Sequence, residues 1–143
     1  MYRAKSLTRV TPSPRFGLVE IERLHGHEKI RPSLLADLTD RIRKDGVLKR
    51  PVLVAARALV ILDGHHRVEA LRNLGCKRVP AYLVDYESKI VRLTTWPDAA
   101  VKVVTKPEVI RRGLAGDRFP PKTTRHTLAV PIEDRPVKLD DLR

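Results

Sequence analysis

The sequence is poor in cysteine and in long apolar runs, and both shortages exclude classes of protein. Cys76 is the only cysteine, so no internal disulfide can form and a reducing compartment is the expected setting. No stretch of about 18 apolar residues is present, and the basic, proline-containing segment 1–15 does not resemble a signal peptide. We therefore expect a cytoplasmic protein without a membrane partner, in which Cys76 is a small buried residue.

Aromatic residues and negative charge are also scarce. Aromatic side chains make up 4% of the chain, which leaves few stacking platforms for single-stranded nucleic acids. Lysine and arginine number 29 against 17 acidic residues, a net charge of +12, so the partners are expected to be anionic. The basic residues are scattered, so charge alone does not choose between nucleic acid and a small phosphate ester, although nucleic acid is disfavoured. Glutamine is absent, which together with abundant arginine and proline suits a protein from a hot environment.

The length of 143 residues fits one domain with a substantial core. Hydrophobic periodicity predicts a series of short strands, at residues 18–21, 51–55, 58–62, 79–84 and 90–94, of which the second and third form a hairpin. It also predicts three helices, one from Pro32 to Gly46, one ending at Gly75, and one over residues 106–114. Segment 127–132 is a candidate last strand, and the charged tail to Arg143 is expected to be a surface element.

The most informative segment joins the strand at 58–62 to the helix that ends at Gly75. Its residues are Asp63, Gly64, His65, His66 and Arg67. A helix N-terminus offers unpaired backbone N–H groups and the positive end of the helix dipole, and glycine lets the backbone approach a ligand closely. The segment therefore predicts a phosphate site. The alternative is that the aspartate is only an N-cap and the three residues after the glycine form a solvated first turn.

Glu28 is a second candidate, because it follows His27 in a turn where no helix cap requires a carboxylate. If Glu28 and Asp63 come together, they can divide the work of phosphoryl transfer. One would accept the proton of the attacking hydroxyl, and the other would hold magnesium or a polarised water. The alternative is a solvated loop glutamate.

A third candidate site lies near the C-terminus, in a segment that its two prolines exclude from a helix. It contains five hydrogen-bonding residues in a row, which suit a phosphate or a carboxylate: Lys122, Thr123, Thr124, Arg125 and His126. An exposed basic loop is the alternative. Trp96, the only tryptophan, can wall a small pocket or fill the core. The histidine spacings do not suit a zinc site, and no Walker-type glycine loop is present.

Segment 18–86 resembles the ParB N-terminal and sulfiredoxin-like superfamily. Within it, His27-Glu28, residues 45–51, residues 61–67 and residues 80–86 are most similar to the archaeal free serine kinases, as is the Phe-Pro-Pro-Lys-Thr-Thr-Arg-His segment at 119–126. The resemblance implies an α+β fold, a small mixed sheet packed with helices. It implies a single domain over 1–143, with 18–96 as a nucleotide-binding core and 97–143 as a substrate-site extension.

The resemblance also implies an activity, the transfer of a phosphoryl group from ADP or ATP, with magnesium, to the hydroxyl of free L-serine. Glu28 would then be the base, and Asp63 the second essential acid and a magnesium ligand. Residues 64–67 would hold the nucleotide phosphates, with Lys49 and Arg50 nearby, and Trp96 would line the serine pocket. Residues 122–126 would bind the transferred phosphate or the serine carboxylate.

Three departures limit the resemblance. The stretch between Trp96 and the 119–126 segment is much shorter than in the archaeal kinases, so the acceptor could differ from serine, or a homodimer rather than a monomer could complete the pocket. The motif has no cysteine before its His-Arg pair, which excludes sulfinic-acid chemistry, and His65-His66 replaces the Glu-Arg of the ParB nucleotide box. The alternative function is a non-catalytic ParB-like nucleotide-binding regulator that binds DNA.

Overall fold

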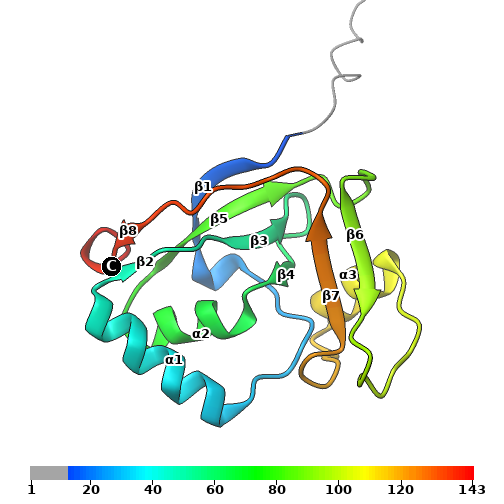
Figure 1. The fold of residues 1–143 in the computed structure, drawn as a ribbon, viewed down its shortest axis with the longest axis horizontal. Helices are drawn as coiled ribbons and strands as arrows, with labels where there is room; N and C mark the ends of the chain where they lie inside the picture. Colours follow the sequence, from blue (N-terminus) through cyan, green and yellow to red (C-terminus); the bar gives the residue numbers. More distant parts are fainter. Residues whose placement is uncertain (1–12) are drawn as a thin grey trace, which may run out of the picture.

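A computed structural model describes residues 13–143 and centres on a four-stranded mixed sheet (Figure 1). The strand order is β1 (Arg15–Glu20), β5 (Arg78–Val84), β3 (Val52–Ala55) and β4 (Ile61–Asp63). β1 pairs antiparallel with β5, β5 pairs parallel with β3, and β3 pairs antiparallel with β4. The predicted hairpin and the α+β fold are confirmed.

Both faces of this sheet are covered. Helices α1 (Pro32–Asp45) and α2 (His65–Asn73) lie together against one face, as Figure 1 shows. The other face packs against α3 (Lys106–Ala115) and a two-stranded antiparallel ribbon of β6 (Val91–Thr95) and β7 (Thr124–Leu128). β3 therefore consists entirely of buried apolar residues, as expected of a strand with no solvent-facing side.

The alternation of side chains along β3 divides the core into two parts. Val52 and Val54 pack in the cluster with Ile42 of α1 and Leu71 of α2. Leu53 and Ala55, which alternate with these valines along β3, pack in the cluster that includes Val109 of α3. This follows from the two-residue period of a strand.

The helix boundaries follow signals visible in the sequence. Pro32 is the first residue of α1, and Gly46 ends that helix with a left-handed φ of 70°. The hydroxyl of Thr105 accepts a hydrogen bond from the amide of Glu108 and caps α3, and Gly116 ends it with a φ of 73°. The predicted helices are confirmed to within one or two residues.

The predicted last strand at 127–132 is wrong in position. β7 begins at Thr124, because its pairing with β6 runs from Thr95 opposite Thr124 to Val91 opposite Leu128. The side chain at Thr124 is buried and His126 is half-buried, so polar residues occupy inward positions of the strand. An apolar alternation therefore could not mark where this strand starts.

The expected surface tail is also corrected. β8 (Val137–Lys138) pairs with β2 (Val47–Leu48), and two buried leucines, Leu139 and Leu142, join the core on the α1 and α2 side. Cys76 is buried beside Leu139, as expected of a small apolar residue. Two short 3-10 helices, Ile21–Arg23 and Leu139–Asp141, complete the elements.

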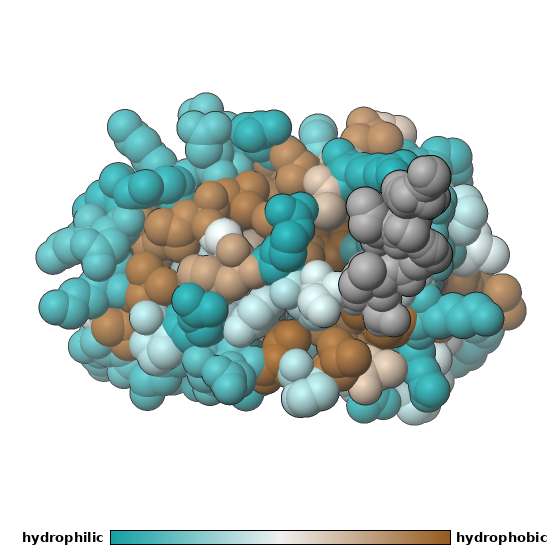
Figure 2. All heavy atoms as spheres, turned by 90° about the horizontal axis from the view of Figure 1, so that it is seen from above, coloured by the Kyte–Doolittle hydropathy of each residue, from teal (hydrophilic) through white to brown (hydrophobic). Residues whose placement is uncertain are grey.

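One outer face carries exposed apolar surface. Figure 2 shows an apolar strip ringed by hydrophilic side chains on the face that, in Figure 1, holds β1 and the segment leading to β8. Leu18 and Ile132, on these two segments, are exposed hydrophobic residues. Within residues 13–143, no helix has the length and apolar character that a membrane crossing requires.

Candidate active site

A cleft of about 510 Å³ opens between the N-terminal end of α2 and the β7 segment. Eleven of the thirteen candidate site residues of the sequence line it. Those that do are Glu28, Asp63, Gly64, His65, His66, Arg67, Trp96, Lys122, Thr124, Arg125 and His126. Leu38 and Leu62 complete the lining. We call residues 63–67 the α2 wall, and Glu28 with residues 122–126 the β7 wall.

The α2 wall depends on Gly64. Gly64 is the N-cap of α2 with φ of 108°, and no side chain caps the helix. A Cβ atom at this position would lie 2.4 Å from Cγ1 of Val52, so only glycine fits. The backbone N–H groups of the first turn are thus left without a capping side chain, and they open toward the cleft. Asp63 ends β4 with its side chain largely exposed, so the interpretation of Asp63 as the N-cap is wrong.

Arg67 anchors this wall to the sheet. Its Nη1 donates hydrogen bonds to the carbonyl oxygens of Arg50 (2.8 Å) and Pro51 (2.9 Å), and its Nη2 lies 3.4 Å from Oδ2 of Asp63. The side chain is only 16% exposed, and burial lowers the pKa of its guanidinium. A solvated first turn is therefore excluded.

The two histidines of the α2 wall bind the loop that carries Glu28. Nε2 of His65 accepts a hydrogen bond from the amide of His27 (3.1 Å), and Nε2 of His66 accepts one from the amide of Arg31 (3.0 Å). Burial lowers the pKa of both rings, strongly for His65. Both rings are therefore neutral near pH 7, and each keeps its proton on Nδ1.

Glu28 is held in the β7 wall by backbone donors. Its Oε1 accepts from the amide of Lys122 (3.2 Å), and its Oε2 accepts from the amide (2.7 Å) and the hydroxyl of Thr124. Lys122 has a left-handed φ of 56°, a strained conformation for a residue other than glycine. Glu28 is 9% exposed, and burial raises its pKa although the bonds from Thr124 and Lys122 lower it. A solvated loop glutamate is excluded.

His27 lies behind Glu28 and is fully buried. Its Nδ1 lies 2.8 Å from the carbonyl oxygen of Ile61 and its Nε2 lies 2.8 Å from Oγ1 of Thr124. Burial lowers the pKa of His27 to about 4. From the sequence, His27 was predicted as neither a site residue nor a metal ligand. Its partners lie 34 and 97 residues away, so no local pattern could reveal its place.

Trp96 walls the cleft and does not fill the core. It is 38% exposed, its Nε1 donates to the carbonyl oxygen of Thr124 (3.0 Å), and the Arg125 guanidinium lies 4.8 Å from the ring centroid. Thr123 is buried outside the cleft lining, where its hydroxyl donates to the carbonyl oxygen of Pro120 (2.7 Å). Thr123 is therefore a turn residue.

His126 is linked to Tyr86 across the β7 wall. The two side chains are 2.7 Å apart, between Nε2 and the phenol oxygen. Burial raises the pKa of Tyr86 and lowers that of His126 to about 3, so the phenol donates to a neutral ring. Tyr86 lies in segment 80–86, which carries part of the family resemblance, but it was not a predicted site residue.

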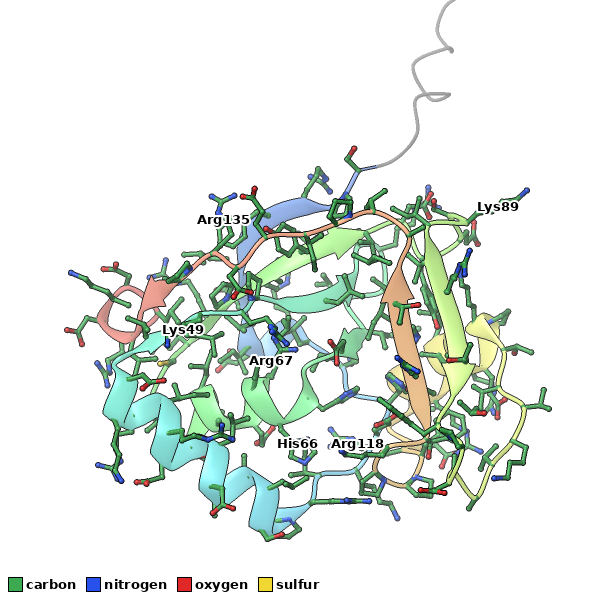
Figure 3. The ribbon with its side chains drawn as sticks, viewed as in Figure 1. Lys49, His66, Arg67, Lys89, Arg118 and Arg135 are labelled. Atoms are coloured by element: carbon green, nitrogen blue, oxygen red, sulfur yellow. The ribbon has the colours of Figure 1, made fainter. Side chains whose placement is uncertain are left out.

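The positions of two cations, Arg118 and Lys49, differ from what the sequence predicted. Figure 3 shows Arg118 and His66 at the same end of α2, with Lys49 near β2 toward the other end. Arg118 lies beside Gly26 and His65, and its charge contributes to the lowered pKa of His65. Lys49 does not line the cleft, and the Arg50 side chain pairs with Asp134. Arg118 does not line the cleft either, but it lies beside His65 of the α2 wall and was not a predicted site residue.

A second hollow, of about 670 Å³, lies elsewhere on the molecule. It is lined by Ala55, Ala56, Ala58, Leu83, Val84 and Ile110, with Arg15, Arg57, Asp85 and Glu87 at its edges and Ser13 and Tyr86 completing it. None of the predicted site residues contributes to it. The walls of this larger hollow are mainly apolar and its charges are of both signs. The smaller cleft is therefore the better phosphate site.

The donor set of the cleft suits magnesium only in a nucleotide-bound form. Among residues 13–143, no cluster of three or more metal-ligating side chains exists. Asp63 nevertheless offers an exposed carboxylate beside the α2 N-terminus. Magnesium is commonly held by one or two carboxylates together with substrate phosphates and water, and one aspartate meets that requirement.

Known proteins are similar to this chain in sequence and in fold. An ATP-dependent L-serine kinase of Staphylothermus marinus is 38% identical over 93 residues, which cover 62% of this chain and 37% of the relative. An ATP-dependent L-serine kinase of Desulfurococcus mucosus is 36% identical over 104 residues, which cover 68% of this chain and 40% of the relative. This chain thus spans about two fifths of the length of these curated relatives.

A solved structure of a free serine kinase in complex with AMP has the same fold. Its TM-score is 0.81 at 20% identity, and the match covers 90% of this chain and 93% of that chain. Residues 17–94, more than half of the sequence, match the ParB N-terminal domain. The chain therefore belongs to the ParB N-terminal domain family.

Proposed function

We propose that this protein is a small-molecule kinase that transfers the terminal phosphoryl group of ADP or ATP to the hydroxyl of free L-serine. The observation that carries this proposal is that a carboxylate suited to accept a proton and a helix end suited to bind an anion line the same cleft. Glu28 is a buried carboxylate with a raised pKa, and it lines the same cleft as the uncapped N-terminus of α2. The names of the relatives, L-serine kinases, agree with this chemistry.

The α2 wall is proposed to hold the nucleotide. The first-turn amides of α2, next to Gly64, would donate to phosphate oxygens, and the positive end of the helix dipole would favour their charge. Lys122 of the cleft lining would add positive charge, as would Arg118, which lies beside His65 but outside the lining, while Arg67 keeps the wall in place through the carbonyls of residues 50 and 51. In this proposal, residues 18–96 form the nucleotide-binding core.

The β7 wall is proposed to hold and deprotonate serine. Glu28 would accept the proton of the serine hydroxyl as that oxygen attacks the terminal phosphorus. One P–O bond to serine forms while the P–O bond to the departing nucleotide breaks. A raised pKa suits this role, since a carboxylate that is too acidic is a poor base. Arg125 and Trp96 would receive the rest of serine, so residues 97–143 complete the substrate side.

Asp63 is proposed as the protein ligand of magnesium. When bound with the nucleotide, magnesium supplies charge neutralisation at the phosphates. By holding this magnesium at the end of β4, Asp63 would orient the nucleotide in the cleft that Glu28 also lines.

The test is a direct assay. The protein is incubated with ADP or ATP, magnesium and L-serine, and O-phosphoserine is measured by mass spectrometry, with L-threonine and glycerol as competing acceptors. We expect phosphoserine with at least one nucleotide. No turnover with any acceptor, together with salt-sensitive DNA binding, would instead favour a non-catalytic regulator.

A further inference from the structure

Three side chains form a continuous hydrogen-bonded series that runs from the β7 wall of the cleft into the core. Oε2 of Glu28 contacts Oγ1 of Thr124, which lies 2.8 Å from Nε2 of His27, and Nδ1 of His27 lies 2.8 Å from the carbonyl oxygen of Ile61. Glu28, Thr124 and His27 are 9%, 7% and 0% exposed, so water does not compete for these contacts. This hydrogen-bonded series begins at the proposed base, Glu28, and ends at the backbone carbonyl of Ile61.

The positions of the hydrogens follow from which groups can donate a hydrogen bond and which can only accept one. A carbonyl oxygen can only accept, so Nδ1 of His27 carries the hydrogen that faces Ile61. His27 is fully buried, and its ring lies 4.7 Å and 5.6 Å, between centroids, from His65 of α2 and His126 of β7. Neither of these rings supplies a negative charge; Oε2 of Glu28 lies 3.8 Å from Nε2 of His27, but burial outweighs this charge and lowers the pKa of His27 to about 4. His27 is therefore neutral, and its Nε2 is an acceptor.

The Thr124 hydroxyl then faces two acceptors with a single hydrogen. When Glu28 is ionised, the hydroxyl donates to Oε2, and Nε2 of His27 has no donor. When Glu28 is protonated, the new O–H donates to Oγ1 of Thr124, and the hydroxyl is free to donate to Nε2. Only the protonated form satisfies every member of the chain, and an unsatisfied buried acceptor is costly.

We propose that Thr124 and His27 are positioning residues that increase the proton affinity of Glu28 through this two-state hydroxyl. The inference deepens the proposed kinase function and rests on it for its catalytic meaning. The proton moves from the serine oxygen to the carboxyl group of Glu28, whose O–H then points at Oγ1 of Thr124, and the Thr124 O–H turns from Oε2 to Nε2 of His27. After product release the proton leaves Glu28 for water, and the hydroxyl turns back.

The sharpest test compares His27→Leu with His27→Gln. Both lose the hydrogen bond to Ile61, but only glutamine keeps an oxygen that can accept from Thr124. The pKa of Glu28 is measured by carboxyl carbon NMR, and the acid limb of kcat/KM for serine is measured against pH. In His27→Leu both should move to lower pH by about one unit, the equivalent of one buried hydrogen bond. In His27→Gln most of the shift should be absent.

A second pair keeps the test independent of how well His27 variants fold. Thr124→Ser retains the hydroxyl and should keep the wild-type acid limb, whereas Thr124→Val should reduce kcat at least about tenfold, as expected for loss of a buried hydrogen bond at the base. Thr127→Val, on an exposed position of the same strand, is the matched control and should change neither quantity.

An unchanged pKa of Glu28 in His27→Leu would overturn the proposal, as would a shift to higher pH, which would mean that His27 carries a positive charge beside Glu28. Because the NMR titration needs no turnover, it separates this inference from the kinase proposal. A wild-type protein that makes no phosphoserine contradicts the kinase proposal, and the NMR shift alone decides the hydroxyl switch.

Discussion

The two walls of the cleft use backbone donors in opposite ways. On the α2 wall, no side chain caps the first turn, so the helix N-terminus remains available to a ligand. On the β7 wall, the amides of Lys122 and Thr124 already bind Glu28. The difference indicates that one wall is built to receive an outside anion and the other to control the protonation of an internal one. Removing a feature of one wall therefore tests whether the other wall depends on it.

The largest effect is expected on the β7 wall, from Glu28→Gln. Glutamine keeps an oxygen for the Lys122 or Thr124 amide but cannot take a proton, so kcat should fall by about 10²- to 10⁴-fold. Nucleotide Kd, measured by calorimetry, should stay within about twofold because the α2 wall is untouched. Glu22→Gln, on the exposed 3-10 helix, is the control for loss of one negative charge. Equal losses of binding and turnover would show that the two walls are not separable.

Two buried histidines, His27 behind Glu28 and His126 of the β7 wall, should make stability depend on pH. The pKa values of His27 and His126 are lowered to about 4 and about 3 by burial, whereas both rings protonate near 6.5 when unfolded. The unfolded chain therefore binds more protons between these values, so stability is complete above pH 6.5 and is lost as pH falls toward 4. For His27 alone the loss is on the order of 3 kcal/mol. Glu28, with a raised pKa, acts in the opposite sense.

Urea unfolding at pH 7 and pH 4.5 measures this dependence. We expect a lower urea midpoint at pH 4.5, and a smaller difference between the two pH values in His27→Gln. A midpoint that does not change between the two pH values would mean that these rings are not buried as neutral groups.

The α2 wall is tested by Gly64→Ala. The new Cβ would meet Val52 at 2.4 Å at a φ of 108°, so the free energy of unfolding should fall by about 2–4 kcal/mol and nucleotide binding should weaken. Gly116→Ala is the matched control. It also has a left-handed φ but no atom within 4 Å, so it should lose only about 1 kcal/mol. Similar losses in both variants, by thermal unfolding, would remove the argument from close approach.

The smallest effect distinguishes two cations. Arg118→Ala should raise the nucleotide Kd by up to about tenfold, since a positive charge beside His65 of the α2 wall is lost. Lys49→Ala removes the same charge away from the cleft and should leave Kd unchanged. If calorimetry gives the reverse order, nucleotide lies nearer β2 than the cleft suggests.

The sequence predicted the α2 wall far better than the β7 wall. Residues 63–67 are contiguous, and a strand that runs into a helix through glycine is a local signal. In contrast, Glu28 and Thr124 are 96 residues apart, and their contact depends on the register of β7 with β6. Only the family resemblance suggested that both belong to one site.

The other departures have the same physical origin. The tail was expected at the surface because charges surround Leu139 and Leu142, yet both leucines fill a gap in the core beside Cys76. The resemblance linked Lys49 to the nucleotide, yet Lys49 follows β2 and does not line the cleft. Local patterns predicted the elements, and tertiary packing decided which polar residues face the cleft.

The most direct test of the central claim is a crystal structure of the complex with ADP and magnesium. The account predicts phosphate oxygens within hydrogen-bond distance of the first-turn amides of α2, with the Glu28 carboxylate facing the terminal phosphorus across the cleft. A nucleotide in the larger hollow beside Ala55 and Tyr86, with the α2 amides left unbound, would contradict it.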